Sequence, residues 1–134
     1  MRRVVVTGLG VFAATGKDPE VFFTNLIQGR SGVHRITQFD PSALSVQIAA
    51  EIPDYRPTDY FPSKRLDLID RFTEFGLIAA RQAMETSGLE VREQDRARFG
   101  VMMGSGMGGA QTYEVSYCSI FAKGATRVPA LQCR

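Results

Sequence analysis

The chain has 134 residues, of which 44% are hydrophobic and 22% are charged, and its formal net charge at pH 7 is +2. These values are typical of a globular protein with a domain-sized core, and they exclude the strongly basic surface of a nucleic-acid-binding protein. No apolar stretch approaches the length of a membrane span, and the short valine-rich start lacks a signal-peptide cleavage pattern. We therefore expect a cytoplasmic protein that binds no nucleic acid and has no membrane span.

The first predicted elements are a strand over residues 2–10 and a helix that follows it. Three consecutive valines give a continuous apolar run, which suits a strand covered on both faces of a layered α/β fold. Further along, Asp18 can cap a helix, Pro19 fits its first turn and Gly29 can end it. Apolar pairs four residues apart give this helix one face to bury, namely Phe22 with Leu26 and Phe23 with Ile27.

The region after this helix is predicted to be irregular. Residues 30–62 contain four prolines and several other turn signals, which indicates an ordered surface excursion rather than a linker. Within this region "VQIAAEI", residues 46–52, predicts one short strand.

A second long helix is predicted over residues 65–87, with Gly88 as its stop. Gly76 lies inside it at a cost of about 1 kcal/mol relative to alanine, so we expect close packing against a neighbour there. A short strand over 98–103 and a helix over 109–122 complete the pattern, which predicts an α/β fold with a sheet between helix layers. The positions that repeat at helical spacing, and are expected to face the core, are Ile69, Phe72, Phe75, Ala79 and Ala83.

Two glycine-rich stretches raise the question of nucleotide binding. "GSGMGG" fits G-x-G-x-x-G at Gly104, Gly106 and Gly109, and Gly8 with Gly10 begins a near-match. A dinucleotide site also needs an acidic residue at the end of the next strand, about 20 positions on, which neither stretch has. We favour the alternative that these glycines permit close packing and positive φ. A nucleotide-binding module is the less favoured reading.

The cysteines and the histidine do not form a recognisable site. Cys118, Cys133 and the lone His34 match neither a metal-ligand spacing nor a disulfide framework, so we expect no metal, no cofactor and a reducing compartment. Cys118, inside a predicted helix, is expected to be a packed free thiol. Cys133, the next-to-last residue of this sequence, is expected to be an unstructured thiol, and His34 a solvated side chain. Nothing in the sequence supports a catalytic pair of Cys118 and His34.

Five stretches, taken together, closely resemble the amino-terminal part of the β-ketoacyl-[acyl-carrier-protein] synthases. The similarity is collinear from about residue 2 to about residue 128, and it is strongest to the elongating type II condensing enzymes of fatty-acid synthesis. Each stretch alone is a weak signal, but five in the right order identify the family. They are "RRVVVTGLGVFAATG", "LIQGRSGV", "ITQFDPSA" with "IAAEI", "DRFTEFGLIAARQAMETSGL" and "FGVMMGSGMGG".

The resemblance implies a fold and a reaction. The fold is thiolase-like, with two similar halves in α-β-α-β-α layers, and residues 1–134 would be a single partial domain, the amino-terminal half of such a fold. The enzymes of this family are homodimers that need no cofactor and extend an acyl chain by decarboxylative Claisen condensation with malonyl-carrier protein. A cysteine thiolate at a helix amino-terminus takes the acyl group, and two histidines assist decarboxylation and stabilise the enolate oxygen.

The resemblance also implies positions for a binding site. Gly104, Gly106, Gly108 and Gly109 match the family's glycine turn beside the acyl pocket and near the dimer interface, and Met107 matches the apolar side chain at the far end of that pocket. A methionine that merely fills core space is the alternative.

Basic side chains that match the family's contacts for the acidic acyl carrier protein form a second candidate surface. They are Lys64, Arg65 and Arg127, although Asp67 and Leu68 stand where relatives are often basic. For all three, solvated surface charge is the alternative.

Besides Asp67 and Leu68, the sequence departs from the family in two further ways. No position matches the catalytic cysteine or either histidine, so this chain alone is predicted to be inactive. Its last residues, "TRVPALQCR", keep Arg127 and Val128 and then diverge, an ending that a frame change, alternative splicing or an incomplete gene model would explain. The alternative function is a non-catalytic isoform or a partner that dimerises with a complete synthase.

Because apolar faces would lack their partners, we expect the isolated chain to be marginally stable or aggregation-prone. An organelle would be the compartment if a transit peptide has been removed.

Overall fold

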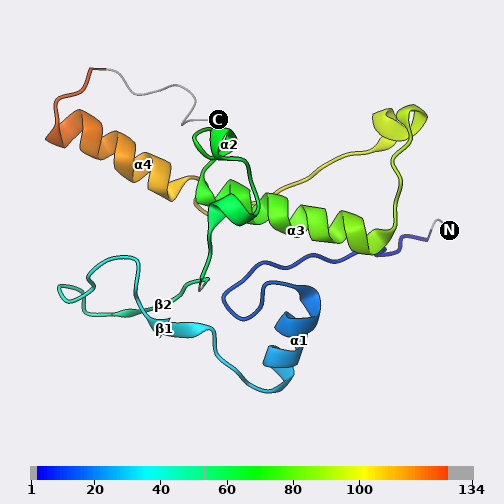
Figure 1. Ribbon diagram of the computed structural model, residues 1–134, viewed down its shortest axis with the longest axis horizontal. Helices are drawn as coiled ribbons and strands as arrows, with labels where there is room; N and C mark the ends of the chain where they lie inside the picture. The colour runs from blue at the N-terminus through cyan, green and yellow to red at the C-terminus, as the bar shows by residue number, and fades with distance from the viewer. Residues whose placement is uncertain (1–2, 53, 127–134) are drawn as a thin grey trace. The chain divides into compact units, whose positions relative to one another are not determined.

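The computed structural model describes residues 3–52 and 54–126, which form helices and one small sheet (Figure 1). In chain order the elements are α1 (Pro19–Ile27), β1 (Val33–Arg35), β2 (Ile48–Ala50), the 3₁₀ turn η1 (Pro57–Asp59), α2 (Ser63–Leu66), α3 (Arg71–Ser87), the 3₁₀ helix η2 (Glu93–Arg98), α4 (Ala110–Tyr117) and the π-helical turn η3 (Cys118–Ala122).

The chain divides into two compact units, and α3 contributes to both. Unit 1 comprises the residues up to Arg56 together with Ile78–Gly88, and unit 2 comprises Pro57–Leu77 together with the residues from Leu89 onward. Each unit has a small apolar core: among the described residues, the hydrophobic side chains that are buried are Ile52 and Ile78 in unit 1 and Phe61 in unit 2.

Helix α1 forms where the local signals predict it. The Asp18 side chain accepts a hydrogen bond from the Val21 amide at 2.9 Å, Pro19 occupies the first turn, and Glu20 adds an acidic side chain there. Gly29 follows the helix with φ of +66°. The predicted cap, first turn and stop of this helix are confirmed.

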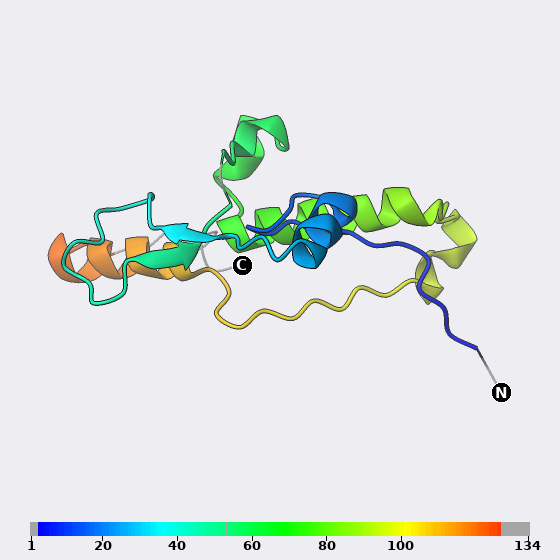
Figure 2. The same cartoon turned by 90° about the horizontal axis from the view of Figure 1, so that it is seen from below.

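The sheet of unit 1 is a pair of short antiparallel strands. β1 and β2 pair with Val33 opposite Ala50 and Arg35 opposite Ile48, and Figure 2 shows them side by side. The strand predicted in "VQIAAEI" is therefore confirmed in its centre, whereas β1 was not predicted. A three-residue strand carries too little alternating pattern to be recognised without its partner.

The amino-terminal segment of unit 1 packs against the second half of α3. The Gln82 side chain accepts a hydrogen bond from the Val11 amide at 2.8 Å and donates one to the Lys17 carbonyl at 2.7 Å. The Thr86 hydroxyl accepts from the Leu9 amide at 3.1 Å and donates to the Leu9 carbonyl at 2.9 Å. These bonds join backbone groups near the start of the chain to a helix more than sixty residues later.

Two expected strands are not strands in this structure. In the part of the chain that the structure describes, residues 3–10 and 98–103 pair with no strand, and Figure 1 draws no arrow for them. Residue 98 is the last residue of η2. Their apolar side chains are open to solvent, with 95% of Val4 and 100% of Met102 exposed. The prediction of a sheet between helix layers is therefore wrong for the described residues, because a strand needs neighbouring strands that a local apolar run does not supply.

The helix predicted over residues 65–87 is two helices. α2 ends at Leu66 and α3 begins at Arg71, with the residues between them outside either helix. The predicted core face is also only partly right: Phe72 is 40% exposed, whereas Ile78, which was not among the expected core positions, is buried. Breaking the helix at Asp70 gives the second helix its own start, which the apolar spacing alone did not indicate.

Candidate functional site

The glycine turn of unit 2, residues 104–109, leads directly into α4. The Gly108 amide donates a hydrogen bond to the Ser105 hydroxyl at 2.8 Å, and the Ala110 amide donates to the Gly108 carbonyl at 3.0 Å. Gly108 has φ of +64°, a conformation that favours glycine. Gly104 and Gly106 have open space where a Cβ would lie. Of these glycines, Gly108 is required by its conformation.

Asp70 joins the amino-termini of α3 and α4. Its Oδ1 accepts a hydrogen bond from the Phe72 amide at 3.3 Å, in the first turn of α3. Its Oδ2 accepts one from the Thr112 amide at 2.9 Å and a second from the Thr112 hydroxyl. Thr112 lies in the first turn of α4, so a single carboxylate caps both helices.

Two methionines lie near this turn in different surroundings. Met107, in the turn itself, is 77% exposed. Met103 packs against Gly76 of α3: a Cβ at Gly76 would lie 2.8 Å from the Met103 Cε. The expected close packing at Gly76 is therefore confirmed, and the neighbour is a methionine side chain.

The basic candidates lie on α2 or outside the described residues. Lys64 and Arg65 are neighbours in this four-residue helix of unit 2, and both are exposed. Asp67 caps the carboxyl end of α2, so an acidic side chain follows the two basic ones at once. Arg127, the third candidate, falls outside the residues that the structure describes.

Cys118 and His34 have the surroundings of ordinary side chains. Cys118 begins the π-helical turn η3 and is exposed, so the expectation of a packed thiol is wrong. His34 lies in β1, where its Nε2 is 3.5 Å from Glu51 Oε2 and its Nδ1 lies 3.2 Å from the Gly32 carbonyl. The His34 side chain is 40% exposed, so it is partly solvated as expected, and it has these two protein neighbours in addition. Cys133 falls outside the described residues.

Glu51 is the centre of this small polar cluster in unit 1. Its carboxylate accepts hydrogen bonds from the Thr37 amide at 2.9 Å and the Thr37 hydroxyl at 2.8 Å. The hydroxyl bond is the largest cause that holds the pKa of the Glu51 carboxyl below its ordinary value. The cluster ties the chain after β1 to the residue that follows β2, which is a structural role.

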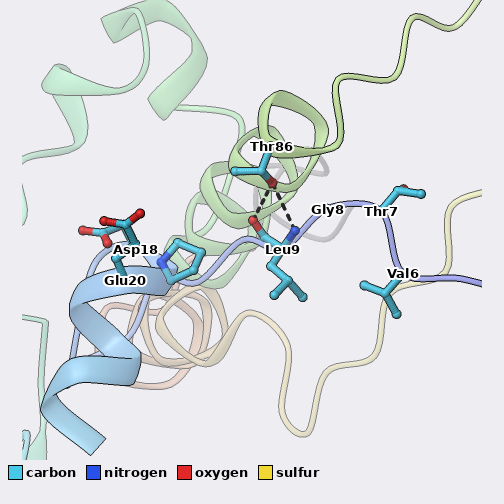
Figure 3. Close-up of a pocket in the computed structure, with 8 residues that line it drawn as sticks. Val6, Thr7, Gly8, Leu9, Asp18, Glu20 and Thr86 are labelled. Atoms are coloured by element: carbon cyan, nitrogen blue, oxygen red, sulfur yellow. Dashed lines mark hydrogen bonds between the residues drawn. The ribbon is translucent and has the colours of Figure 1, made fainter.

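An open cavity of about 640 Å³ lies in unit 1 and contains none of the predicted site residues (Figure 3). Its lining comes from residues 6–9, residues 18–20 and Thr86. The carboxylates of Asp18 and Glu20 belong to the start of α1, and Thr86 is occupied by the two bonds to Leu9 that Figure 3 shows. This lining offers no cysteine, histidine or lysine as a nucleophile or base.

The geometry of both glycine stretches disfavours phosphate binding. A dinucleotide places its pyrophosphate at the amino-terminus of the helix after the turn, but at α4 the Asp70 carboxylate already bonds to that terminus and would repel an anion. In the first stretch, a Cβ at Gly8 or Gly10 would lie 2.1 or 1.8 Å from a carbonyl oxygen of α3. Both stretches thus serve close packing and turn geometry, as the favoured alternative predicts.

The described part of the chain offers few other kinds of site. No group of three or more His, Cys, Asp or Glu side chains among residues 3–52 and 54–126 is placed to hold a metal ion. Over the same residues, no helix combines the length and the apolar character that crossing a membrane requires. The candidate site is therefore the glycine turn with Met107, together with the basic pair on α2.

Asp70 is the residue of this site that the sequence interpretation missed. An aspartate immediately before a run of helical apolar spacing is a recognised start signal, and "IDRFTEF" carries it. The uninterrupted apolar pattern on both sides of residue 70 concealed the helix boundary. Its second role, as a cap for α4, joins residues 42 positions apart and has no local signal.

Comparison with known proteins gives one consistent result. The family model "Beta-ketoacyl synthase, N-terminal domain" matches residues 1–129. A 3-oxoacyl-[acyl-carrier-protein] synthase 2 of Staphylococcus aureus (strain COL) is 35% identical over 127 residues, and one of Coxiella burnetii (strain RSA 493 / Nine Mile phase I) is 41% identical over 127 residues. Each alignment covers 95% of this chain and 31% of the relative, so the chain spans about a third of their length.

A solved structure agrees with these relatives. The ishigamide ketosynthase/chain length factor superposes with a TM-score of 0.79 at 30% sequence identity, over 99% of this chain and 33% of that one.

Proposed function

The chain belongs to the β-ketoacyl synthase family, and from that premise we infer that it serves as the amino-terminal part of a 3-oxoacyl-[acyl-carrier-protein] synthase of fatty-acid biosynthesis. Such an acyltransferase elongates an acyl thioester by decarboxylative Claisen condensation with malonyl-carrier protein. The observation that carries this proposal is the unbroken match over residues 1–129. The curated relatives matched over nearly the same span are synthases of this kind.

Under this proposal the described residues bind and position, and the chemistry lies elsewhere in the protein. Neither Cys118, exposed in η3, nor His34, bonded to Glu51, has the surroundings of a catalytic thiolate or of an oxyanion donor. We therefore propose that residues 1–134 supply no catalytic residue and are inactive alone. The match to about a third of each relative supports this division.

The proposal also accounts for the exposed apolar segments. In a thiolase-like fold with α-β-α-β-α layers, residues 3–10 and 98–103 would become covered strands of a sheet, and residues 1–134 would form one incomplete domain. The high exposure of four apolar side chains supports this, namely Val4, Val6, Val101 and Met102. Another layer of the fold would cover these side chains, and their burial would stabilise the complete fold.

Two surfaces of unit 2 receive proposed roles. Met107 would line the far end of the acyl pocket, where a flexible thioether can accommodate acyl chains of different length. Lys64, Arg65 and Arg127 would contact the acidic acyl carrier protein. The exposure of Lys64 and Arg65 on α2 supports this use. The functional protein would be a cytoplasmic homodimer that needs no cofactor.

The second candidate is a non-catalytic chain that binds a complete synthase. The large exposed apolar surface favours it, since 84% of Val101 and 100% of Met102 are open to solvent and such segments associate readily with another polypeptide. The intact mass of the native polypeptide in source cells separates the two. A mass near three times 14.8 kDa supports the enzyme, whereas a mass near 14.8 kDa supports the binding chain.

The direct test joins this chain to the two thirds of a relative that it does not match. Residues 1–129 are joined to the remaining part of the S. aureus synthase, and formation of 3-oxoacyl product from acyl- and malonyl-carrier protein is measured. We expect condensing activity from the chimera and none from the 134-residue chain. A chimera that melts cooperatively as a dimer but forms no product would contradict the proposed function.

The same chimera tests carrier-protein docking. Lys64→Glu places a negative charge where an acidic carrier is proposed to dock, so the KM for carrier-bound substrate is expected to rise about five- to tenfold. The KM for an acyl pantetheine thioester, which lacks the carrier protein, should stay the same. Lys123→Glu, an equal charge change at an exposed lysine after η3, is the matched control. An unchanged KM for the carrier-bound substrate would remove the docking proposal.

A further inference from the structure

Helix α4 begins without a cap of its own. Its amino-terminal neighbour is Gly109, which has no side chain to accept a hydrogen bond, and its first turn contains no acidic residue. Helix α1 shows the usual arrangement instead, with Asp18 as the cap and Glu20 in the first turn. The Ala110 amide donates to the Gly108 carbonyl, but the Thr112 amide has no partner within the turn or the helix and depends on a group from elsewhere in the chain.

Asp70 supplies that group. Its Oδ2 accepts from both the amide and the hydroxyl of Thr112, while its Oδ1 accepts from Phe72 in α3. The carboxylate also touches the end of the glycine turn, because a Cβ built on Gly109 would lie 3.1 Å from Oδ2. A side chain at position 109 would thus crowd the carboxylate, and glycine leaves room for this contact.

Through the turn, this contact also affects the backbone at Met107. Gly108 separates Met107 from Gly109, and its amide is bonded to the Ser105 hydroxyl, which closes the turn around residues 106 and 107. The left-handed φ of Gly108 sets the direction of the chain between Met107 and the capped helix. Fixing Gly109 and Thr112 therefore restricts where the backbone of Met107 can lie.

We propose that Asp70 is the positioning residue of the glycine turn: its carboxylate holds the start of α4 to the start of α3 and thereby sets the place of Met107. The proposal depends on the proposed function in one respect, since a role for Met107 in the acyl pocket is what makes its position matter to the enzyme. The local contacts stand independently of any activity.

The test is amide hydrogen exchange, followed by residue-resolved mass spectrometry, on the chimera of residues 1–129 with the remaining part of the S. aureus synthase. Asp70→Ala removes every acceptor, so exchange of the Thr112 and Gly108 amides is expected to speed up by about tenfold or more. Asp70→Asn retains one acceptor oxygen and should give a smaller increase at Thr112. The Val21 amide, capped by Asp18, is the internal control and should keep its rate. Asp18→Ala should show the reverse pattern.

Thr112→Val keeps the test decisive if an Asp70 variant fails to fold. It preserves the shape and the amide of residue 112 but removes the hydroxyl that donates to Asp70, so faster exchange is expected at Gly108 with no change at Val21. Gly108 exchange that is unaffected by Thr112→Val and by every folded Asp70 variant would overturn the proposal, because Asp70 would then cap helices without holding the turn.

A functional readout distinguishes positioning from stability. In the chimera, Asp70→Asn is expected to change the ratio of kcat/KM between a long and a short acyl-carrier substrate, which a general loss of stability would not do. An unchanged ratio in an active chimera would overturn the proposed control of Met107. If the chimera is inactive but the exchange pattern is as expected, the proposed function fails and the placement of the turn by Asp70 stands.

Discussion

The two units each contain a glycine-rich stretch, and the glycines answer different physical needs. In unit 1, Gly8 and Gly10 lie so close to α3 that an added Cβ would meet a carbonyl oxygen at 2.1 or 1.8 Å. In unit 2, Gly104 and Gly106 face open space, and Gly108 is needed for its φ of +64°. One stretch is fixed by backbone contact with a helix, the other by the conformation of a turn.

This difference shows why the G-x-G-x-x-G spacing is a weak sign of nucleotide binding. Similar strings arise wherever a chain segment must approach a helix backbone or reverse direction. The side chains around each stretch show which need applies. In unit 1 these are Gln82 and Thr86, which bond to the segment that contains the glycines. In unit 2 the corresponding residue is Asp70, which bonds to the helix after the turn.

The largest effect should come from Gly10→Ala in unit 1. The new Cβ would lie 1.8 Å from the Ala79 carbonyl oxygen, which is helix backbone and cannot move away alone. In the chimera with the S. aureus synthase, we expect the free energy of unfolding to fall by about 3 kcal/mol or more, measured by urea titration with far-UV circular dichroism. Gly104→Ala, at an open position in unit 2, is the control and should be neutral or slightly stabilising. Equal losses from both variants would contradict the comparison.

The next effect should come from Gln82→Met, which keeps the size of the side chain but removes its two hydrogen bonds. The Val11 amide and the Lys17 carbonyl lose their partner, and we expect a loss of about 2 kcal/mol of unfolding free energy. Urea titration gives the loss, and faster exchange of the Val11 amide gives its location. Unchanged exchange at Val11 would show that the amino-terminal segment does not depend on α3.

In unit 2 the corresponding substitution is Gly108→Ala, with a smaller expected effect. An alanine pays about 1 kcal/mol to adopt a left-handed conformation, although the space around it is open. Gly106→Ala, two positions earlier and without that φ, should cost less. If Gly106→Ala proved the more costly of the two, contact rather than conformation would govern this turn as well.

The smallest effect concerns the Glu51 cluster of unit 1 and depends on pH. Because hydrogen bonds from Thr37 hold the pKa of Glu51 below its ordinary value, folding favours the ionised form. The contribution is fully present above the unfolded pKa of about 4.3 and is lost as the pH falls through the lower folded value. Glu51→Gln should remove this part of the acid dependence, measured as unfolding free energy between about pH 5 and pH 3. Identical acid profiles would contradict the assignment.

Local signals in the sequence predicted the features that depend on a few neighbouring residues. α1 follows from Asp18, Pro19 and Gly29, which act within the helix that they begin or end. The helix over residues 109–122 corresponds to α4 and its π-helical continuation η3. The order of five motifs predicted the family, which the match over residues 1–129 confirms.

Features that depend on distant residues could not be predicted in the same way. The apolar runs around Val5 and Val101 suggested strands, but a strand exists only when another strand supplies its hydrogen bonds, and the described residues supply none. The exposure of Cys118 likewise depends on what packs against its helix, which a helical pattern alone does not state.

The sequence by itself determined the family and the caps of α1. It also indicated that the two glycine stretches serve close packing or turns. These features are encoded in neighbouring residues or in the order of motifs. Only the tertiary structure decided which glycine serves contact and which serves conformation. It also decided that Asp70 caps two helices at once, because that role requires Thr112, 42 positions away, to meet the same carboxylate.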